Sequence, residues 1–419
     1  MRLSSEAFCK ILQLCLYNVT NINKGISMEE VVIVAAKRSA IGSFLGSLKN
    51  LKATDLAKQL AKAILQSIKL DPHLIDEVIL GQVLQSNQGQ NPARQVLLEI
   101  GGLEKSAFMV NKVCGSGLKA VWLGYQAIAL GDREVVLAGG VENMSLAPFL
   151  LENARSGYKL GNQTLIDAII KDGLWCANTD VHMGITAENL AKKYNISRTE
   201  QDEFALSSQQ KATKAIQEGR FQEEIAPISI QEKKGEFIFL QDEFVKQDST
   251  IEALAKLKPA FLKEGSVSAG NASGINDGAA MLVLMSKTKA KELNLEILAS
   301  LKAFASAGVE PSIMGIGAAV AAKKVMEKTG LQIKDFDLIE ANEAFAAQSI
   351  ACLKELGAKE EKVNVNGGAI ALGHPIGASG ARILVTLIHA LRNQKKNLGL
   401  ATLCIGGGQG ISAVIEINE

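Results

Sequence analysis

Two cysteines and one histidine of this chain lie in glycine-rich turns. Cys114 is followed by Gly-Ser-Gly, His374 lies in a Gly-His-Pro sequence, and Cys404 is followed by Ile-Gly-Gly-Gly. A cysteine thiolate is a strong nucleophile, and an imidazole can remove the proton of a thiol. A second thiol can act as an acid or base at carbon, because its pKa can be brought near neutrality. If the three turns converge in space, they could carry out acyl transfer through a thioester.

The residues of each turn suit a catalytic role for the reactive side chain, and each turn also has a purely structural explanation. Cys114 precedes a predicted helix, whose N-terminus we expect to lower the pKa of the thiol. The glycines around His374 and the proline after it fix the backbone and aim the ring as a base. Cys404 ends an apolar strand, and the glycines after it can offer N–H groups to an oxyanion. The alternatives are a buried cysteine at a helix start, an anion-binding glycine loop with an incidental histidine, and a core cysteine that closes a strand.

The elements that must position these residues alternate between strand and helix. In the first part of the chain, the predicted elements cover in order residues 30–36, 53–68, 78–83, 91–100, 107–111, 117–129 and 134–139. This alternation predicts a mostly parallel sheet with helical crossovers. The segment from about 145 to 271 is more polar and looks like an excursion that caps the sheet. Its predicted elements are helices at 186–194 and 199–218 and a strand-like edge at 226–239, before a strand at 279–286 returns to the sheet.

The second part of the chain repeats this pattern. Its predicted strands and helices cover residues 299–306, 315–329, 338–340, 343–356, 380–391 and 398–404. In both parts a reactive side chain precedes a helix, and the strand that follows ends in glycines. Two similar halves packed side by side would bring their equivalent loops together across a pseudo-twofold axis.

The composition of the 419-residue chain excludes several classes of protein. The formal net charge of +1 creates no field that would attract nucleic acid or an anionic membrane surface. The six cysteines show no metal-ligand spacing and are too sparse for a disulfide framework, so we expect no metal site and a reducing compartment. No apolar run is long enough to span a bilayer.

The first 27 residues form an extension of uncertain status. The apolar stretch 8–17 is interrupted by Lys10 and Gln13, and arginine is sparse, so a transit peptide is poorly supported. We interpret the segment as the product of an upstream start codon, with Met28 as the working start, or as a short ordered extension. The expected location is the cytoplasm, and mitochondrial import remains the alternative.

Taken together, the three motifs resemble those of the thiolase family. The matching stretches are 110–120, 271–280, 340–346, 366–380 and 401–410, and the resemblance covers residues 28–419. It implies an α/β thiolase fold with two duplicated βαβαβαββ halves in a five-layered α/β/α/β/α sandwich. The implied domains are the extension 1–27, an N-terminal half made of 28–144 and 276–295, a loop domain 145–275 for coenzyme A binding and oligomerisation, and a C-terminal half 296–419.

The resemblance also implies a role for each reactive residue. Cys114 would be the acylated nucleophile, and His374 would activate it. Cys404 would take the α-proton from a second acetyl-CoA. Asn342 would hold a water that forms one oxyanion hole with His374, and the backbone N–H groups of Cys114 and Gly406 would form the other.

The coenzyme A site is implied in the same way. Its matching positions are Leu174, His182, Met183, Lys246, Phe261, Ala269, Ser273, Met314, Ala344 and Phe345. Met183 and Met314 would narrow the acyl pocket and disfavour long chains. Lys246 stands where the family often has an arginine that stacks on the adenine. Because lysine has no planar group to stack, we expect weaker binding of coenzyme A or a replaced contact.

The implied reaction joins two acetyl-CoA molecules into acetoacetyl-CoA and CoA, reversibly and by ping-pong Claisen chemistry through acetyl-Cys114. The implied partners are these coenzyme A thioesters, with no permanently bound cofactor and a homotetrameric assembly. The main alternative is a 3-ketoacyl-CoA thiolase of fatty-acid β-oxidation with a wider pocket. A ketoacyl-carrier-protein synthase fits less well, because it lacks a second active-site cysteine. A non-catalytic acyl-CoA or lipid binder would have lost Cys114 or His374, and both are present.

Overall fold

The computed structural model describes residues 29–233 and 235–417. The expectations for residues 1–27 therefore lie outside the described residues. Within the described ranges, no helix is both long enough and apolar enough to cross a membrane.

The N-terminal half follows the expected order of elements. These are β1 (Val31–Arg38), α2 (Ala53–Ser67), β3 (Glu77–Gly81), α3 (Pro92–Glu99), β4 (Ser106–Val110), α4 (Ser116–Ala129), β5 (Val135–Asn143) and, after the loop domain, β12 (Asn276–Ser286). The strands lie in the order β1-β12-β5-β3-β4. β3 is parallel to both of its neighbours, whereas β12 is antiparallel to β1 and β5. The expectation of a mostly parallel sheet holds for the direction of β1, β3, β4 and β5 but not for β12, because the chain leaves β5 and returns in β12 at the same end of the sheet.

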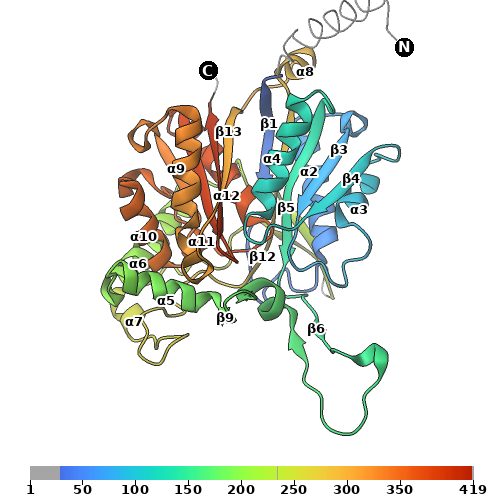
Figure 1. Cartoon of the computed structure of the whole chain (residues 1–419). Helices are drawn as coiled ribbons and strands as arrows, with labels where there is room; N and C mark the ends of the chain where they lie inside the picture. Colours follow the sequence, from blue (N-terminus) through green and yellow to red (C-terminus); the bar gives the residue numbers. More distant parts are fainter. Residues whose placement is uncertain (1–28, 234, 418–419) are drawn as a thin grey trace, which may run out of the picture.

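The C-terminal half repeats this arrangement. Its elements are β13 (Ala299–Gly308), α9 (Gly317–Thr329), β14 (Leu338–Ala341), α10 (Ala346–Leu356), α12 (Ser379–Asn393), β15 (Leu398–Ile405) and β16 (Gln409–Glu416). The strands lie in the order β14-β15-β16-β13, and the counterpart of β4 is reduced to a single parallel bridge between Ile339 and Val363. β1 of the N-terminal half pairs with β13 of the C-terminal half through two residue pairs, so the strands of both halves are joined by hydrogen bonds (Figure 1). The part of the sheet that belongs to each half is called the N-terminal or the C-terminal sheet below.

The sandwich has five layers, held together by three large apolar clusters. The central cluster joins α4 and α12 to the strands of both halves, so these two helices lie between the sheets (Figure 1). A second cluster packs α2 and α3 on the outer face of the N-terminal sheet. A third packs α9 and α10 on the outer face of the C-terminal sheet. The described chain thus has the expected α/β/α/β/α order, and each sheet is buried on both faces.

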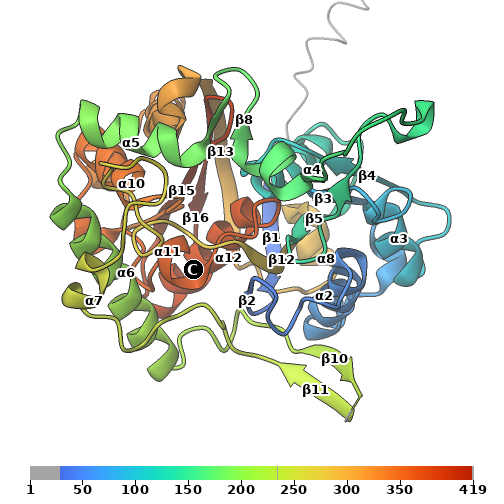
Figure 2. The same ribbon diagram turned by 90° about the horizontal axis from the view of Figure 1, so that it is seen from below.

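The segment between β5 and β12 adds helices and hairpins at one end of the sandwich. α5 (Met183–Lys193), α6 (Arg198–Gln217) and α7 (Ile251–Ala255) lie beside the C-terminal half, where α5 and α6 pack against α10 (Figure 2). α6 begins at a capping box formed by Ser197 and Glu200. The single edge expected at 226–239 is a hairpin of β10 (Ile228–Glu232) and β11 (Gly235–Phe239). The short strands β6 (Phe149–Leu150) and β7 (Ile166–Asp167) bracket an excursion that projects from the molecule (Figure 1).

Candidate active site

The two helices that follow Cys114 and His374 begin against each other. A Cβ on Gly117 would lie 2.8 Å from the backbone nitrogen of Ala381, and one on Gly380 would lie 2.6 Å from that of Leu118. Real Cβ atoms do not approach backbone this closely, so only glycine allows the two helix starts to meet. This contact brings the Cys114 turn and the His374 loop together, as expected from the duplication.

Both residues line one cavity of about 430 Å³. All ten residues predicted for coenzyme A binding line it too, together with Gly406; the ten are Leu174, His182, Met183, Lys246, Phe261, Ala269, Ser273, Met314, Ala344 and Phe345. Asn342 and Cys404 are fully buried and do not line this cavity. Sequence reasoning missed several apolar lining residues, among them Met144, Ile170, Phe244, Ile275 and Ile376. Single apolar residues in loops carry no sequence signal that separates them from core residues.

The Cys114 turn is strained and firmly held. Val113 has a φ of 47°, a left-handed conformation that a β-branched residue rarely adopts. The Ser116 hydroxyl accepts the N–H of Lys112 at 2.8 Å and donates to the Val113 carbonyl at 2.6 Å. The Gly115 N–H donates to the Lys112 carbonyl at 3.0 Å. These bonds fix the thiol at the start of α4, on the wall of the cavity.

The thiol of Cys114 has a raised pKa, contrary to the expectation of a lowered one. Burial raises the pKa of Cys114 to about 11, and the charge of Glu142 adds to the effect. The backbone N–H groups of Gly406 and of Cys114 itself stabilise the thiolate but do not reverse the shift. The helix N-terminus was the only influence visible in the sequence, and the loss of hydration outweighs it.

His374 is held as a neutral base. Its Nδ1 lies 2.6 Å from the hydroxyl of Ser379, which also lies 3.0 Å from the Pro375 carbonyl. A carbonyl can only accept, so the single hydroxyl proton goes to Pro375, and Nδ1–H donates to Ser379. Nε2 therefore carries the lone pair, and it has no hydrogen-bond partner among the described residues. Burial, with the charge of Arg382, lowers the pKa of His374 to about 3.

The backbone of the His374 loop is anchored from the N-terminal half. The His374 N–H donates to the Asn276 side-chain oxygen at 2.9 Å, and the Asn276 amide donates to the Gly42 carbonyl at 3.0 Å. The preceding Gly373 has a φ of 108°, and a Cβ there would lie 2.5 Å from the Asn276 side chain. The loop therefore requires glycine at this position, and the backbone that carries the imidazole is held in one conformation.

Two more predicted residues lie behind the cavity wall. The side-chain oxygen and nitrogen of Asn342 are both buried, and neither finds a partner within the described part of the chain. Unpaired buried polar atoms are costly, so a water or a substrate oxygen would fit there. Burial raises the pKa of Cys404 well above its usual value, and the charge of Cys114 raises it further. The two thiols thus lie within electrostatic range of each other.

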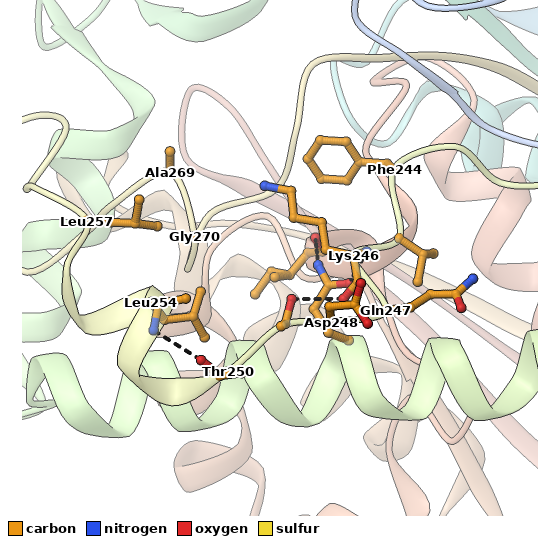
Figure 3. A pocket seen from close by; sticks show the side chains of 14 residues that line it. Phe244, Lys246, Gln247, Asp248, Thr250, Leu254, Leu257, Ala269 and Gly270 are labelled. Atoms are coloured by element: carbon orange, nitrogen blue, oxygen red, sulfur yellow. Dashed lines mark hydrogen bonds between the residues drawn. The ribbon is translucent and has the colours of Figure 1, made fainter.

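A second cavity of about 620 Å³ continues the first. The two cavities share Phe244, Lys246 and Ala269, which Figure 3 shows among the residues that line the second cavity. The ammonium of Lys246 lies 5.7 Å from the centre of the Phe244 ring, and its backbone N–H donates to Gln209 at 2.8 Å. Lys246 therefore stands at the junction of an inner, mostly apolar space and an outer, more polar one.

Aromatic contacts shape the inner cavity. The rings of His182 and Phe261 are stacked with centroids 4.8 Å apart, and Phe261 meets Phe345 edge-on at 6.1 Å. His182 Nδ1 also accepts the N–H of Gly184 at 3.0 Å. Because three predicted binding residues contact one another, they form a rigid wall for an extended ligand.

The chain matches two family models over nearly its whole described length. Residues 31–288 match the model described as "Thiolase, N-terminal domain", and residues 295–417 match "Thiolase, C-terminal domain". An acetyl-CoA acetyltransferase of Escherichia coli (strain K12) is 59% identical over 391 residues, which are 93% of this chain and 99% of that protein. One of Pseudomonas aeruginosa is 56% identical over 390 residues, with coverages of 93% and 99%.

The chain is also similar to solved structures over nearly its whole length. The Bacillus anthracis acetyl-CoA acetyltransferase superposes with a TM-score of 0.92 at 46% identity, covering 94% of this chain and 100% of that one. Human mitochondrial 3-ketoacyl-CoA thiolase superposes with a TM-score of 0.91 at 44% identity, with coverages of 94% and 100%.

Proposed function

Since the chain belongs to the thiolase family, we propose that it is an acetyl-CoA C-acetyltransferase, which condenses two acetyl-CoA molecules to acetoacetyl-CoA and CoA and catalyses the reverse reaction. The observation that carries this proposal is a single cavity lined by the Cys114 thiol and by His374, whose Nε2 is an unprotonated base. The relatives that are 59% and 56% identical bear the same activity in their names.

The first half-reaction uses the neutral Cys114–His374 pair. His374 Nε2 takes the thiol proton while the Cys114 sulfur attacks the thioester carbonyl of acetyl-CoA. The N–H groups of Cys114 and Gly406, which stabilise negative charge on the sulfur, are positioned to stabilise the resulting oxyanion. The C–S bond to coenzyme A then breaks, and the leaving thiolate takes the proton from His374. The product is acetyl-Cys114 and free CoA.

The second half-reaction requires a base at Cys404. An acetylated Cys114 can carry no charge that would raise the pKa of Cys404. The neutral His374 takes the proton of the Cys404 thiol, which leaves Cys404 as a thiolate and His374 with a proton on Nε2. Cys404 then takes the α-proton of a second acetyl-CoA, and His374 with a water on Asn342 stabilises the enolate oxygen. The carbanion attacks the carbonyl of acetyl-Cys114, and the C–S bond to Cys114 breaks. Acetoacetyl-CoA leaves, the Cys114 thiolate takes the proton back from His374, and Cys404 keeps the α-proton, so the resting state is restored.

The size of the cavity favours a short acyl group. Met183 and Met314 line the cavity, and both are buried. The sulfur of Met183 lies 3.4 Å from the position that a Cβ of Gly406 would take, beside the proposed oxyanion site. A chain longer than a few carbons would have to displace these side chains.

The second candidate function is a broader 3-ketoacyl-CoA thiolase of fatty-acid β-oxidation, which the human mitochondrial structure favours. The experiment compares thiolytic rates on acetoacetyl-CoA and 3-ketohexadecanoyl-CoA. A clear preference for acetoacetyl-CoA supports the acetyltransferase, and a preference for the long chain replaces it with the second candidate. No thiolysis of either substrate would reject both.

The domain boundaries, assembly and location belong to the same proposal. Residues 145–275 supply most of the cavity lining and are proposed as the coenzyme A binding and oligomerisation domain, with no cofactor bound permanently. Phe149, Leu160 and Leu165, in and beside the projecting excursion, are exposed apolar residues, which supports a homotetramer built through this segment. The proposed location is the cytoplasm. Deletion of 151–165 should yield smaller assemblies in size-exclusion chromatography with light scattering.

A further inference from the structure

A buried carboxylate joins the two halves beside the catalytic cavity. Glu142, near the end of β5, is fully buried and does not line the cavity. Its carboxylate accepts three backbone hydrogen bonds, from Val83 at 2.9 Å, Leu84 at 3.1 Å and Gly377 at 2.9 Å. Val83 and Leu84 belong to the loop after β3 in the N-terminal half. Gly377 belongs to the loop of the C-terminal half that carries His374.

The His374 loop lies directly on β5 with no intervening side chain. A Cβ on Gly377 would lie 2.7 Å from the Glu142 carboxylate and 2.8 Å from the Cα of Gln82. A Cβ on Gly140 would lie 2.2 Å from the Gly377 carbonyl oxygen. The hydrogen bond from Gly377 to Glu142 therefore holds the loop against β5, at a point three residues after the bond from His374 to Asn276.

We propose that Glu142 is a positioning residue for the Cys114–His374 pair, which holds the His374 loop of one half against the Cys114 side of the other. The proposal rests on the proposed function for the identity of the reacting pair. Glu142 acts through the backbone and touches no substrate. Its carboxylate is the acceptor for both loops at once, so losing an acceptor oxygen loosens their mutual alignment.

The surroundings of Glu142 shift its pKa, so that its carboxyl group changes charge near neutral pH. Burial raises the pKa of Glu142 to about 7, against the three backbone hydrogen bonds that lower it, and the charge of Asp277 on β12 raises it further. The titratable groups that face it are Asp277 and Cys114, and His374 lies three residues before Gly377. A protonated Glu142 would turn an acceptor oxygen into a donor that faces N–H groups.

The test compares Glu142→Gln with Asp76→Asn. Asp76 is a matched control, because its carboxylate accepts the backbone N–H groups of Glu134 at 2.9 Å and Val135 at 3.1 Å, at the opposite end of β5. The readout is the rate at which iodoacetamide alkylates Cys114, followed by peptide mapping. This rate depends on the alignment of His374 with the thiol and requires no acyl transfer.

The two effects of Glu142→Gln on alkylation have opposite signs. Removing a negative charge near Cys114 makes the thiolate easier to form and by itself speeds alkylation. Loss of alignment slows it, and a displacement of about 1 Å changes rates by about 100-fold. We expect a rate about 10- to 100-fold below wild type in Glu142→Gln and a wild-type rate in Asp76→Asn. An unchanged or faster rate in Glu142→Gln, or an equal loss in both variants, overturns the proposal.

If Glu142→Gln does not fold, the pH profile of the wild-type alkylation rate decides. The rate should fall as pH drops through about 7, whereas His374, with a pKa of about 3, stays neutral there. The fall in rate should persist in Asp277→Asn, because the group that titrates is Glu142 and not its acidic neighbour Asp277. A flat profile down to pH 5 overturns the proposal. If wild-type Cys114 is alkylated but not acetylated by acetyl-CoA, the proposed function is rejected, whereas the role of Glu142 is still decided by the alkylation rates of the two variants and the pH profile.

Discussion

Replacement of His374 by asparagine tests the neutral Cys114–His374 pair most directly. With a pKa of about 11, the Cys114 thiol is ionised at pH 7 in roughly one molecule in 10⁴, so fast attack at this pH requires a base that takes the proton as the bond to the thioester forms. Acetylation of Cys114 in His374→Asn should therefore fall by about 10²- to 10⁴-fold at pH 7. The rate should then rise about tenfold per pH unit up to about pH 10, because each unit increases the thiolate fraction tenfold.

The assay is single-turnover acetylation by acetyl-CoA, quenched in acid and read by intact-protein mass spectrometry. The wild-type rate should be nearly constant above pH 7, since proton transfer to His374 accompanies attack. His389→Asn is the matched control, because His389 is another mostly buried histidine on α12, bonded through Nε2 to the Ala36 carbonyl at 2.9 Å. A loss below tenfold, or a flat pH profile in His374→Asn, would refute the assignment of His374 as the base.

Three further outcomes are expected. Cys404→Ala should still acquire an acetyl group on Cys114 but fail at condensation, seen as a mass adduct without acetoacetyl-CoA formation. Lys246→Arg should lower KM for coenzyme A about threefold or more while kcat stays unchanged, if its side chain at the junction of the cavities faces the adenine. Met183→Ala should raise relative kcat/KM on 3-ketohexanoyl-CoA about tenfold and lower stability by about 2–5 kcal/mol in chemical denaturation, because a buried side chain is lost.

Each of these outcomes has a clear opposite. Loss of acetylation in Cys404→Ala would show that its role is misassigned. An unchanged KM in Lys246→Arg would place the lysine away from the adenine. Unchanged chain-length preference in Met183→Ala would show that another residue closes the acyl space.

The sequence predicts the site better than it predicts the electrostatics of the site. The turns around Cys114 and His374 carry glycine spacings that are visible without a structure, and the two turns converge because Gly117 and Gly380 let α4 and α12 meet. The pKa of Cys114 was predicted in the wrong direction, because a sequence shows a helix start but not the loss of hydration around a thiol.

The fold was likewise predicted in part. The alternating elements of both halves appear close to their predicted positions. The elements predicted from periodicity ended at 398–404 and did not include β16, which only the resemblance to the thiolase family implied, as the last strand of a βαβαβαββ half. The antiparallel direction of β12 depends on where the chain re-enters the sheet after 145–275, which local periodicity does not encode. Glu142 was overlooked because a lone acid near the end of an apolar strand gives no hint of three backbone partners.

The central place of β1 has a consequence for how the chain folds. β1 pairs with β12 and β13, whose partner residues lie about 240 or more positions later in the chain. At ribosomal rates of about 5–20 residues per second, β1 waits on the order of 10–50 s for these partners. During that interval an apolar strand has two open edges, which is a typical site of misassembly. Residues 28–144 are therefore not a unit that can finish folding before β12 has been made, and one edge of β1 stays open until β13 follows.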